Sequence, residues 1–151
     1  MTRPGDGVHT LPPLPPAAGG YYAWKVDVDA TAATTPAAAC GAVVKVRGRP
    51  VVTLTAPPTA AAGTVAVPMT VSGVPFAMRV DLTLKLYALD DTTCSSPIAE
   101  DDVSRGGDGS VEGRVWADAG PYRWQAVVAP GDLWQGAQST CGAPGSTTQV
   151  S

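Results

Sequence analysis

The sequence predicts an all-β protein built as an antiparallel β-sandwich of two packed sheets. Ala, Val, Thr, Gly and Pro dominate the 151 residues, and the 17 glycines and 15 prolines would interrupt any helix of ordinary length. Short apolar alternations separated by turn signals recur from residue 51 onward. Whole-chain disorder is the competing interpretation of this composition, but such alternation is hard to reconcile with a disordered chain.

The clearest predicted strand spans residues 80–87. Its apolar side chains fall on one face and its polar side chains on the other, which is typical of a half-buried strand. The core face holds Val80, Leu82, Leu84 and Leu86, and the solvent face holds Asp81, Thr83, Lys85 and Tyr87. Six further segments complete the expected set of about seven strands, which implies two packed sheets. They are Val51–Thr55, Thr64–Ser72, Ile98–Val103, Val111–Trp116, Tyr122–Val128 and Ser146–Ser151.

The chain also contains an internal repeat with an offset of about a hundred residues. Residues 20–24 (GYYAW) match 120–124 (GPYRW), residues 39–42 (ACGA) match 140–143 (TCGA), and residues 3–7 (RPGDG) resemble 105–109 (RGGDG). We therefore expect 1–49 to be the second half of one repeat and 50–151 to be a complete copy. The proline-rich run at 11–16 is then an irregular edge strand and corner, or alternatively a polyproline II linker.

A corner motif lies at residues 118–124, which read DAGPYRW. This DxGxYxW pattern resembles the DxGxYxC signature of the immunoglobulin superfamily, with tryptophan replacing the second core cysteine. Beside Asp118, Gly120 permits a tight corner and the Tyr122 hydroxyl can bond the backbone across it, while Trp124 points into the core. The usual inter-sheet disulfide is not expected, because the strand at 64–72 has no cysteine.

Taken together, the motifs resemble the tandem immunoglobulin-like repeats of actinobacterial cell-surface proteins. The resemblance rests on Tyr122 with Trp124, on Gly131-Asp132 and on Cys141-Gly142; it covers 51–151 fully and 5–47 in part. It implies an extracellular stalk or adhesin module with an immunoglobulin-like fold, no catalytic residues and no cofactor. It also implies a disulfide between Cys94 and Cys141, with the partner of Cys40 lying upstream. Three reduced cysteines in a cytosolic protein are the alternative.

Several functional classes receive no support from the sequence. Only 15% of residues are charged and the net charge is −3, so no basic field exists to attract nucleic acid. Apolar stretches are too short for a membrane span. His9 is the only histidine, and no nucleophile motif accompanies it. Acidic residues at 90–91 and 100–102 are calcium-ligand types, but their spacing matches no known calcium loop and favours solvated turns.

Two functional hypotheses remain, with an enzyme the least favoured reading. The first is a rigid spacer or adhesive module whose partners are neighbouring repeats. The second is a module that binds a protein or glycan through an exposed Trp134, with an indole folded back onto the core as the alternative. In the half-repeat, Trp24, Val26 and Val28 lack a facing sheet. We expect that segment to dock on the following domain, to detach, or to pair with another copy.

Overall fold

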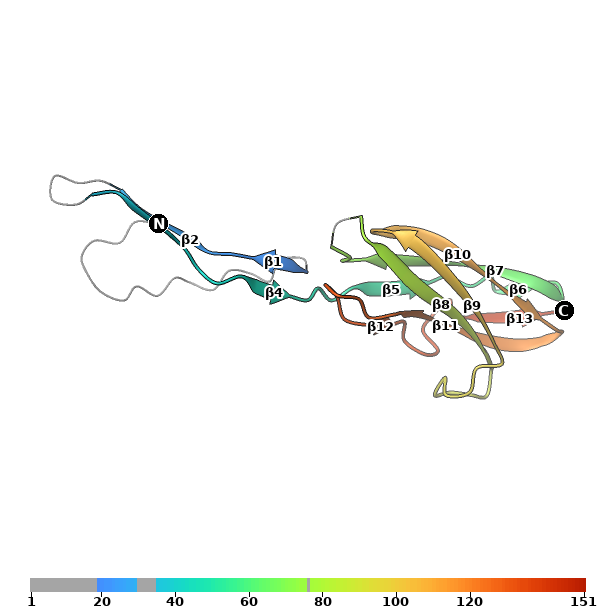
Figure 1. Ribbon diagram of the computed structural model, residues 1–151. Helices are drawn as coiled ribbons and strands as arrows, with labels where there is room; N and C mark the ends of the chain where they lie inside the picture. Colours follow the sequence, from blue (N-terminus) through green and yellow to red (C-terminus); the bar gives the residue numbers. More distant parts are fainter. Residues whose placement is uncertain (1–18, 30–34, 76) are drawn as a thin grey trace.

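The computed structural model describes residues 19–29, 35–75 and 77–151, and these residues form strands and connecting loops without any helix. Two packed sheets form a sandwich over 51–150, and a narrow two-stranded arm formed within 20–46 leads into one end of it (Figure 1). The C-terminus lies at the opposite end of the sandwich. Three features discussed from the sequence lie outside the described residues: His9, the match at 3–7 and the proline-rich run at 11–16.

The smaller sheet has three antiparallel strands in the order β10-β7-β5. Valine and methionine supply the inward side chains of its central strand, which suit a pleated surface packed on one face. Every second residue of the central strand is buried from Val65 to Val71, as a half-buried strand requires. The strands are β5 (Val51–Leu54), β7 (Gly63–Ser72) and β10 (Gly109–Ala117).

The larger sheet has the order β6-β13-β11-β8-β9, with β12 pairing beside β11. All its pairings are antiparallel except that of β6 with β13, which is parallel. A three-stranded sheet thus faces a six-stranded sheet, and the chain crosses repeatedly between them, which confirms the predicted immunoglobulin-like antiparallel sandwich. The strands are β6 (Thr59–Ala60), β8 (Arg79–Ala88), β9 (Ala99–Gly106), β11 (Gly120–Val128), β12 (Ala137–Gln138) and β13 (Thr147–Val150).

The core lies between the two sheets and is built from the predicted alternating faces. Leu82, Leu84 and Leu86 are at most 1% exposed, and Trp124 is fully buried. The Trp124 indole nitrogen donates a hydrogen bond of 2.8 Å to the Thr148 hydroxyl, so the buried donor is satisfied. Aliphatic side chains from β5, β7 and β10 face this cluster.

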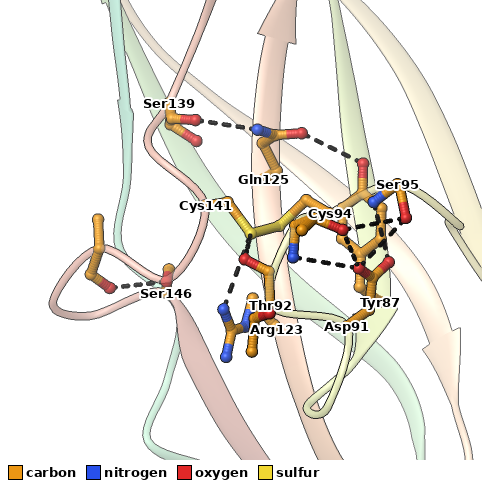
Figure 2. Close-up of a disulfide and its surroundings, with 12 residues drawn as sticks. Tyr87, Asp91, Thr92, Cys94, Ser95, Arg123, Gln125, Ser139, Cys141 and Ser146 are labelled. Carbon is orange, nitrogen blue, oxygen red and sulfur yellow. Dashed lines mark hydrogen bonds between the residues drawn. A yellow bond between two sulfur atoms is a disulfide. The ribbon is translucent and has the colours of Figure 1, made fainter.

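One residue of the predicted solvent face is buried instead. Tyr87 is only 2% exposed, whereas Asp81 on the same face is exposed. The phenol lies beside the loop that carries the disulfide, and its hydroxyl donates to the Gln125 side-chain oxygen at 3.2 Å (Figure 2). Burial raises the pKa of Tyr87. The alternation is therefore correct, but a loop covers the polar end of the strand.

The arm consists of two consecutive antiparallel ladders. The first pairs β1 with β4 next to the sandwich, and the second pairs β2 with β3 farther out (Figure 1). Trp24, Val26 and Val28 stay exposed, so this apolar face does not pack on the following domain; of the outcomes expected for the half-repeat, docking is limited to contacts near the sandwich. The strands are β1 (Gly20–Tyr22), β2 (Lys25–Val28), β3 (Ala37–Cys40) and β4 (Val44–Val46).

Candidate functional site

The residues of the DxGxYxW motif form the corner that leads into β11. The Tyr122 ring folds back over Gly120, where an added Cβ would lie 3.4 Å from the phenolic oxygen. Asp118 accepts a hydrogen bond of 3.3 Å from the indole nitrogen of Trp116, a partner that the sequence did not indicate. Tyr122 is half-buried and Trp124 is buried, so the motif orients one side chain over the corner and the next into the core.

The loop between β11 and β12 contains Trp134, the candidate ligand-binding residue. Its indole is folded back and only 5% exposed, and its nitrogen donates to the Ala129 carbonyl at 3.0 Å. The ring lies against Gly131 so closely that a side chain there would collide with it. The structure thus shows the folded-back indole, which was the alternative to an exposed binding residue, and the ring is a lid over the end of the core.

The Trp134 indole points inward, and the backbone of this loop forms hydrogen bonds with the segment that connects the arm to the sandwich. The Gly48 amide donates to the Leu133 carbonyl at 2.8 Å, and the Gln135 amide donates to the Gly48 carbonyl at 3.0 Å. Gly48 and Trp134 thus form a parallel β-bridge. A Cβ on Gly19 would collide with the Leu133 carbonyl, so the close approach of the two segments depends on glycine there.

Charged and aromatic side chains join the arm to the same loop. Asp132 pairs with the Lys45 ammonium, and its other oxygen accepts a hydrogen bond of 3.1 Å from the Tyr21 hydroxyl. The Lys45 ammonium also lies 5.7 Å from the centre of the Tyr21 ring, within cation–π range. We call these three residues, together with the Gly48–Trp134 bridge, the junction.

The junction shifts the pKa values of both charged groups away from neutrality. The Lys45 ammonium and then the Tyr21 hydroxyl lower the pKa of Asp132 below 3.8. The Asp132 carboxylate raises the pKa of Lys45 above 10.5, against a smaller opposing effect of desolvation. Both groups are therefore charged throughout the neutral range, and the pair persists there.

The arm has the same pairing as a hairpin of the sandwich. In the sandwich, β11 pairs with β12 and β13, and in the arm β2 pairs with β3 while β1 pairs with β4. The outer ladder keeps its register after a shift of 100 residues on both strands (27 to 127 and 38 to 138). Asp27 pairs with Ala38 as Val127 pairs with Gln138, and Val28 pairs with Ala37 as Val128 pairs with Ala137.

The inner ladder matches as well, with a longer loop in the sandwich. Gly20 pairs with Val46 where Gly120 pairs with Val150, so one strand shifts by 100 (20 to 120) and the other by 104 (46 to 150). The Tyr22 ring lies over Gly20, as the Tyr122 ring lies over Gly120. The ladders place Cys40 opposite Lys25, one residue short of the position that the Cys-Gly-Ala match predicts.

The predicted disulfide is present between Cys94 and Cys141, with Cα atoms 5.9 Å apart (Figure 2). Cys40 is a free, exposed thiol, also as expected. The bridge ties the loop after β8 to the loop before β13, and Arg123 lies beside it. The Arg123 guanidinium donates to the Leu89 carbonyl at 3.0 Å and contacts the Cys141 sulfur at 3.7 Å, while its Nε atom is buried without a partner.

In the acidic loop near the disulfide, the Asp91 carboxylate stabilises the turn in which it lies. The Asp91 carboxylate accepts backbone hydrogen bonds from Thr93, Ser95 and Ser96 at 2.9 to 3.2 Å (Figure 2). The Ser96 amide makes the largest contribution to lowering the pKa of this carboxyl. Within the described residues, no cluster of His, Cys, Asp and Glu side chains could hold a metal ion. Asp91 is thus used as a turn-forming residue.

A shallow groove of about 430 Å³ runs between β5 and the segment that contains β12. Its lining contains no acidic, basic, histidine or cysteine side chain. The lining residues are Pro50, Val51, Val52, Thr53, Leu54, Ala137, Gln138, Ser139, Thr140, Ala143, Pro144 and Ser146. The groove therefore offers hydroxyl and amide groups but no acid–base or nucleophilic pair.

No family model matches the sequence, and no curated protein matches it significantly. No helix with the length and apolarity of a membrane span occurs in the described part of the chain.

Proposed function

We propose that this chain is a non-catalytic structural module of a bacterial surface or secreted protein, and that it acts as a rigid spacer in a tandem array of immunoglobulin-like repeats. The observation that carries this proposal is the matching register of the arm and the β11-β12-β13 hairpin. Two hairpins with one register, one sequence pattern and one Tyr-over-Gly contact are what a repeated domain would produce. In this reading, the arm is the last hairpin of the preceding repeat.

The junction supports a mechanical role. A flexible linker would separate consecutive repeats with few contacts, whereas here a backbone bridge, an ion pair and a tyrosine hydroxyl join the arm to the loop at 129–136. The arm enters at one end of the sandwich and the C-terminus lies at the other (Figure 1). Modules connected in this way would line up end to end and hold a distal partner at a distance.

Two further features favour an extracellular, non-enzymatic module. A disulfide persists in oxidising compartments and is rare in the cytosol. The groove beside β5 contains no acidic, basic, histidine or cysteine side chain that could activate its hydroxyl groups, and the carboxylate of Asp91 is engaged by its own loop. Neither observation requires a cofactor, and both fit a protein whose partners are neighbouring repeats.

Small-angle X-ray scattering of the full chain tests the spacer proposal. We expect the curve of a single elongated particle at neutral pH. Asp132→Ala removes the carboxylate that holds both Lys45 and Tyr21, so the scattering should become that of two loosely connected bodies. Asp81→Ala removes a similarly exposed carboxylate on the sandwich, which pairs with Arg79, and should leave the curve unchanged. Flexible scattering from the unaltered chain would contradict the proposal.

Ligand binding is the second candidate function, and the residue that favours it is Trp116 instead of Trp134. Trp116 is 67% exposed on the outer face of β10, whereas Trp134 is buried. An indole with a free face, beside Arg114 and Asp118, could stack on a sugar ring or a partner's side chain. Calorimetric titration of the unaltered chain and of Trp116→Ala with bacterial and host glycans would test this. Equal binding by both proteins would exclude Trp116 as the site.

A further inference from the structure

The arm differs from its counterpart in the sandwich at one edge. In the sandwich, β11 is paired on both edges, with β12 and β13 on one side and with β8 on the other. In the arm, β3 occupies the edge of β2 that corresponds to the β12 edge of β11. Within the described residues, no strand pairs with the edge that corresponds to β8. Unpaired backbone donors and acceptors along an edge are a template for another strand.

The face of the arm is uncovered in the same way. Trp24, Val26 and Val28 are 45%, 52% and 50% exposed. Their counterparts in the sandwich are Trp124, Ala126 and Val128, which are 0%, 0% and 1% exposed. The arm thus keeps the apolar alternation of β11, but no second sheet packs on its apolar face within the described residues. Both this face and the outer edge of β2 are therefore open to a partner.

We propose that the outer edge of β2 is a docking site for the first half of an immunoglobulin-like repeat. The docking element is an antiparallel strand with the apolar alternation of β8, and the sheet that packs with it covers the Trp24 face. This inference rests on the proposed function, because it treats the arm as the hairpin of a repeat. The occupant is the first half of a preceding repeat, of the same kind as 50–104.

The sandwich specifies the register of this docking. Trp124, Ala126 and Val128 lie opposite Leu86, Leu84 and Leu82 of β8. After the shift of 100 residues, Trp24, Val26 and Val28 take the same places opposite the incoming strand. A helix or an irregular loop would leave the β2 backbone unpaired, whereas an extended strand satisfies it and covers the face together with its own sheet.

Charge at the edge further defines the occupant. Gln125 lies opposite Lys85 in the sandwich, and Lys25 takes the place of Gln125 in the arm. A lysine opposite Lys25 would be repelled, because like charges that face each other across two strands are destabilising. The incoming strand therefore carries an acidic or neutral side chain at the position of Lys85.

A fusion protein provides the test. A second copy of residues 50–104 is joined ahead of the full chain, following the match of 3–7 with 105–109. In the added copy, Lys85→Glu removes the charge repulsion and Cys94→Ser prevents any disulfide with Cys40. Trp116→Phe is made in both the fusion and the unfused chain, so that Trp24 is the exposed indole that remains, and the added copy contributes no tryptophan.

Acrylamide quenching and amide exchange then report on the docking. We expect the quenchable indole fluorescence of the unfused chain to be lost in the fusion, and exchange of the amides at 25–28 to slow by at least about 100-fold. A control fusion with Leu82→Ser, Leu84→Ser and Leu86→Ser in the added copy should leave Trp24 quenchable. Both readouts are independent of the junction. Docking can therefore fail while the spacer proposal stands, and the spacer proposal can fail while docking is observed.

Two results would overturn the proposal. The first is a Trp24 that remains as quenchable in the fusion as in the unfused chain. The second is an unfused chain that sediments as a dimer with Trp24 protected, because the occupant would then be a second copy of the arm.

Discussion

Trp24 and Trp124 show that one motif can give opposite environments. Both lie two residues beyond a tyrosine that covers a glycine, yet Trp124 is fully buried and Trp24 is 45% exposed. The motif sets the direction of the indole, and the presence of β8 and the facing sheet sets its burial. For Trp134 the sequence left burial open, because its orientation depends on contact with Gly131 and with the Ala129 carbonyl.

At this scale we predict that Trp124→Ala lowers the free energy of unfolding by about 3 to 5 kcal/mol, the range for removing a large buried aromatic side chain. The same substitution at Trp116, which is 67% exposed, should change it by less than about 0.5 kcal/mol. Urea unfolding followed by circular dichroism measures both. Equal effects of the two substitutions would show that the core is not centred on β11.

The junction predicts a defined pH response. A lowered pKa of Asp132 means that its stabilising contribution is present above 3.8 and is lost as the pH falls through the still lower folded value. The raised pKa of Lys45 means that its contribution is present below 10.5 and is lost as the pH rises through the higher folded value. Between these limits the junction should not respond to pH.

Carbon NMR of the Asp132 carboxyl measures the lower limit directly. We expect its titration midpoint to lie below 3.8 in the unaltered chain and to rise toward 3.8 in Lys45→Met. Lys25→Met removes a different exposed ion pair, with Asp27, and should leave the Asp132 midpoint unchanged. A midpoint at the ordinary value in the unaltered chain would show that Lys45 and Asp132 are not paired in solution.

At the scale of elements, all seven predicted strands are present, and their ends differ from the expected ones by at most three residues, with the largest difference at the C-terminal end of β9. Period-two alternation specifies a half-buried strand locally, so β7, β8 and β11 could be found from sequence. The two-residue strands β6 and β12 could not, because they are too short for a periodic pattern and exist only through pairing with β13 and β11. The burial of Tyr87 was likewise missed, because its hydroxyl bonds to Gln125 of β11, which is 38 residues away in the sequence.

The disulfide is the main covalent restraint on these elements. It closes a segment of 47 residues, for which the chain-entropy relation gives about 4 kcal/mol of stabilisation. We predict that the double substitution Cys94→Ser with Cys141→Ser lowers the free energy of unfolding by about that amount, measured by urea unfolding. Cys40→Ser is the matched control and should have no effect, since that thiol is free and exposed. A loss under about 1 kcal/mol in the double variant would contradict a stabilising role for the bridge.

At the scale of the whole molecule, the sequence predicted a half-repeat followed by a domain but not how the two are joined. Gly131-Asp132 was noted as part of a family-like pattern, yet its partners Lys45 and Tyr21 lie 87 and 111 residues away in sequence. No local periodicity links such positions, and a single sequence carries no signal for the pairing. The offset that relates the two hairpins could be found in the sequence. The exposure of the Trp24 face could not, because it depends on the direction in which the arm leaves the sandwich.

Rigid connection of arm and sandwich is the central claim, and a spin-label distance tests it most directly. The exposed thiol of Cys40 accepts one label on the arm, and Ser104→Cys in β9 provides the second on the sandwich, while the disulfide keeps the remaining cysteines unlabelled. We predict one narrow distance distribution at neutral pH, which broadens when Asp132→Ala is added. A broad distribution in the chain with Asp132 intact would show that the arm swings freely, and the spacer account would then be wrong.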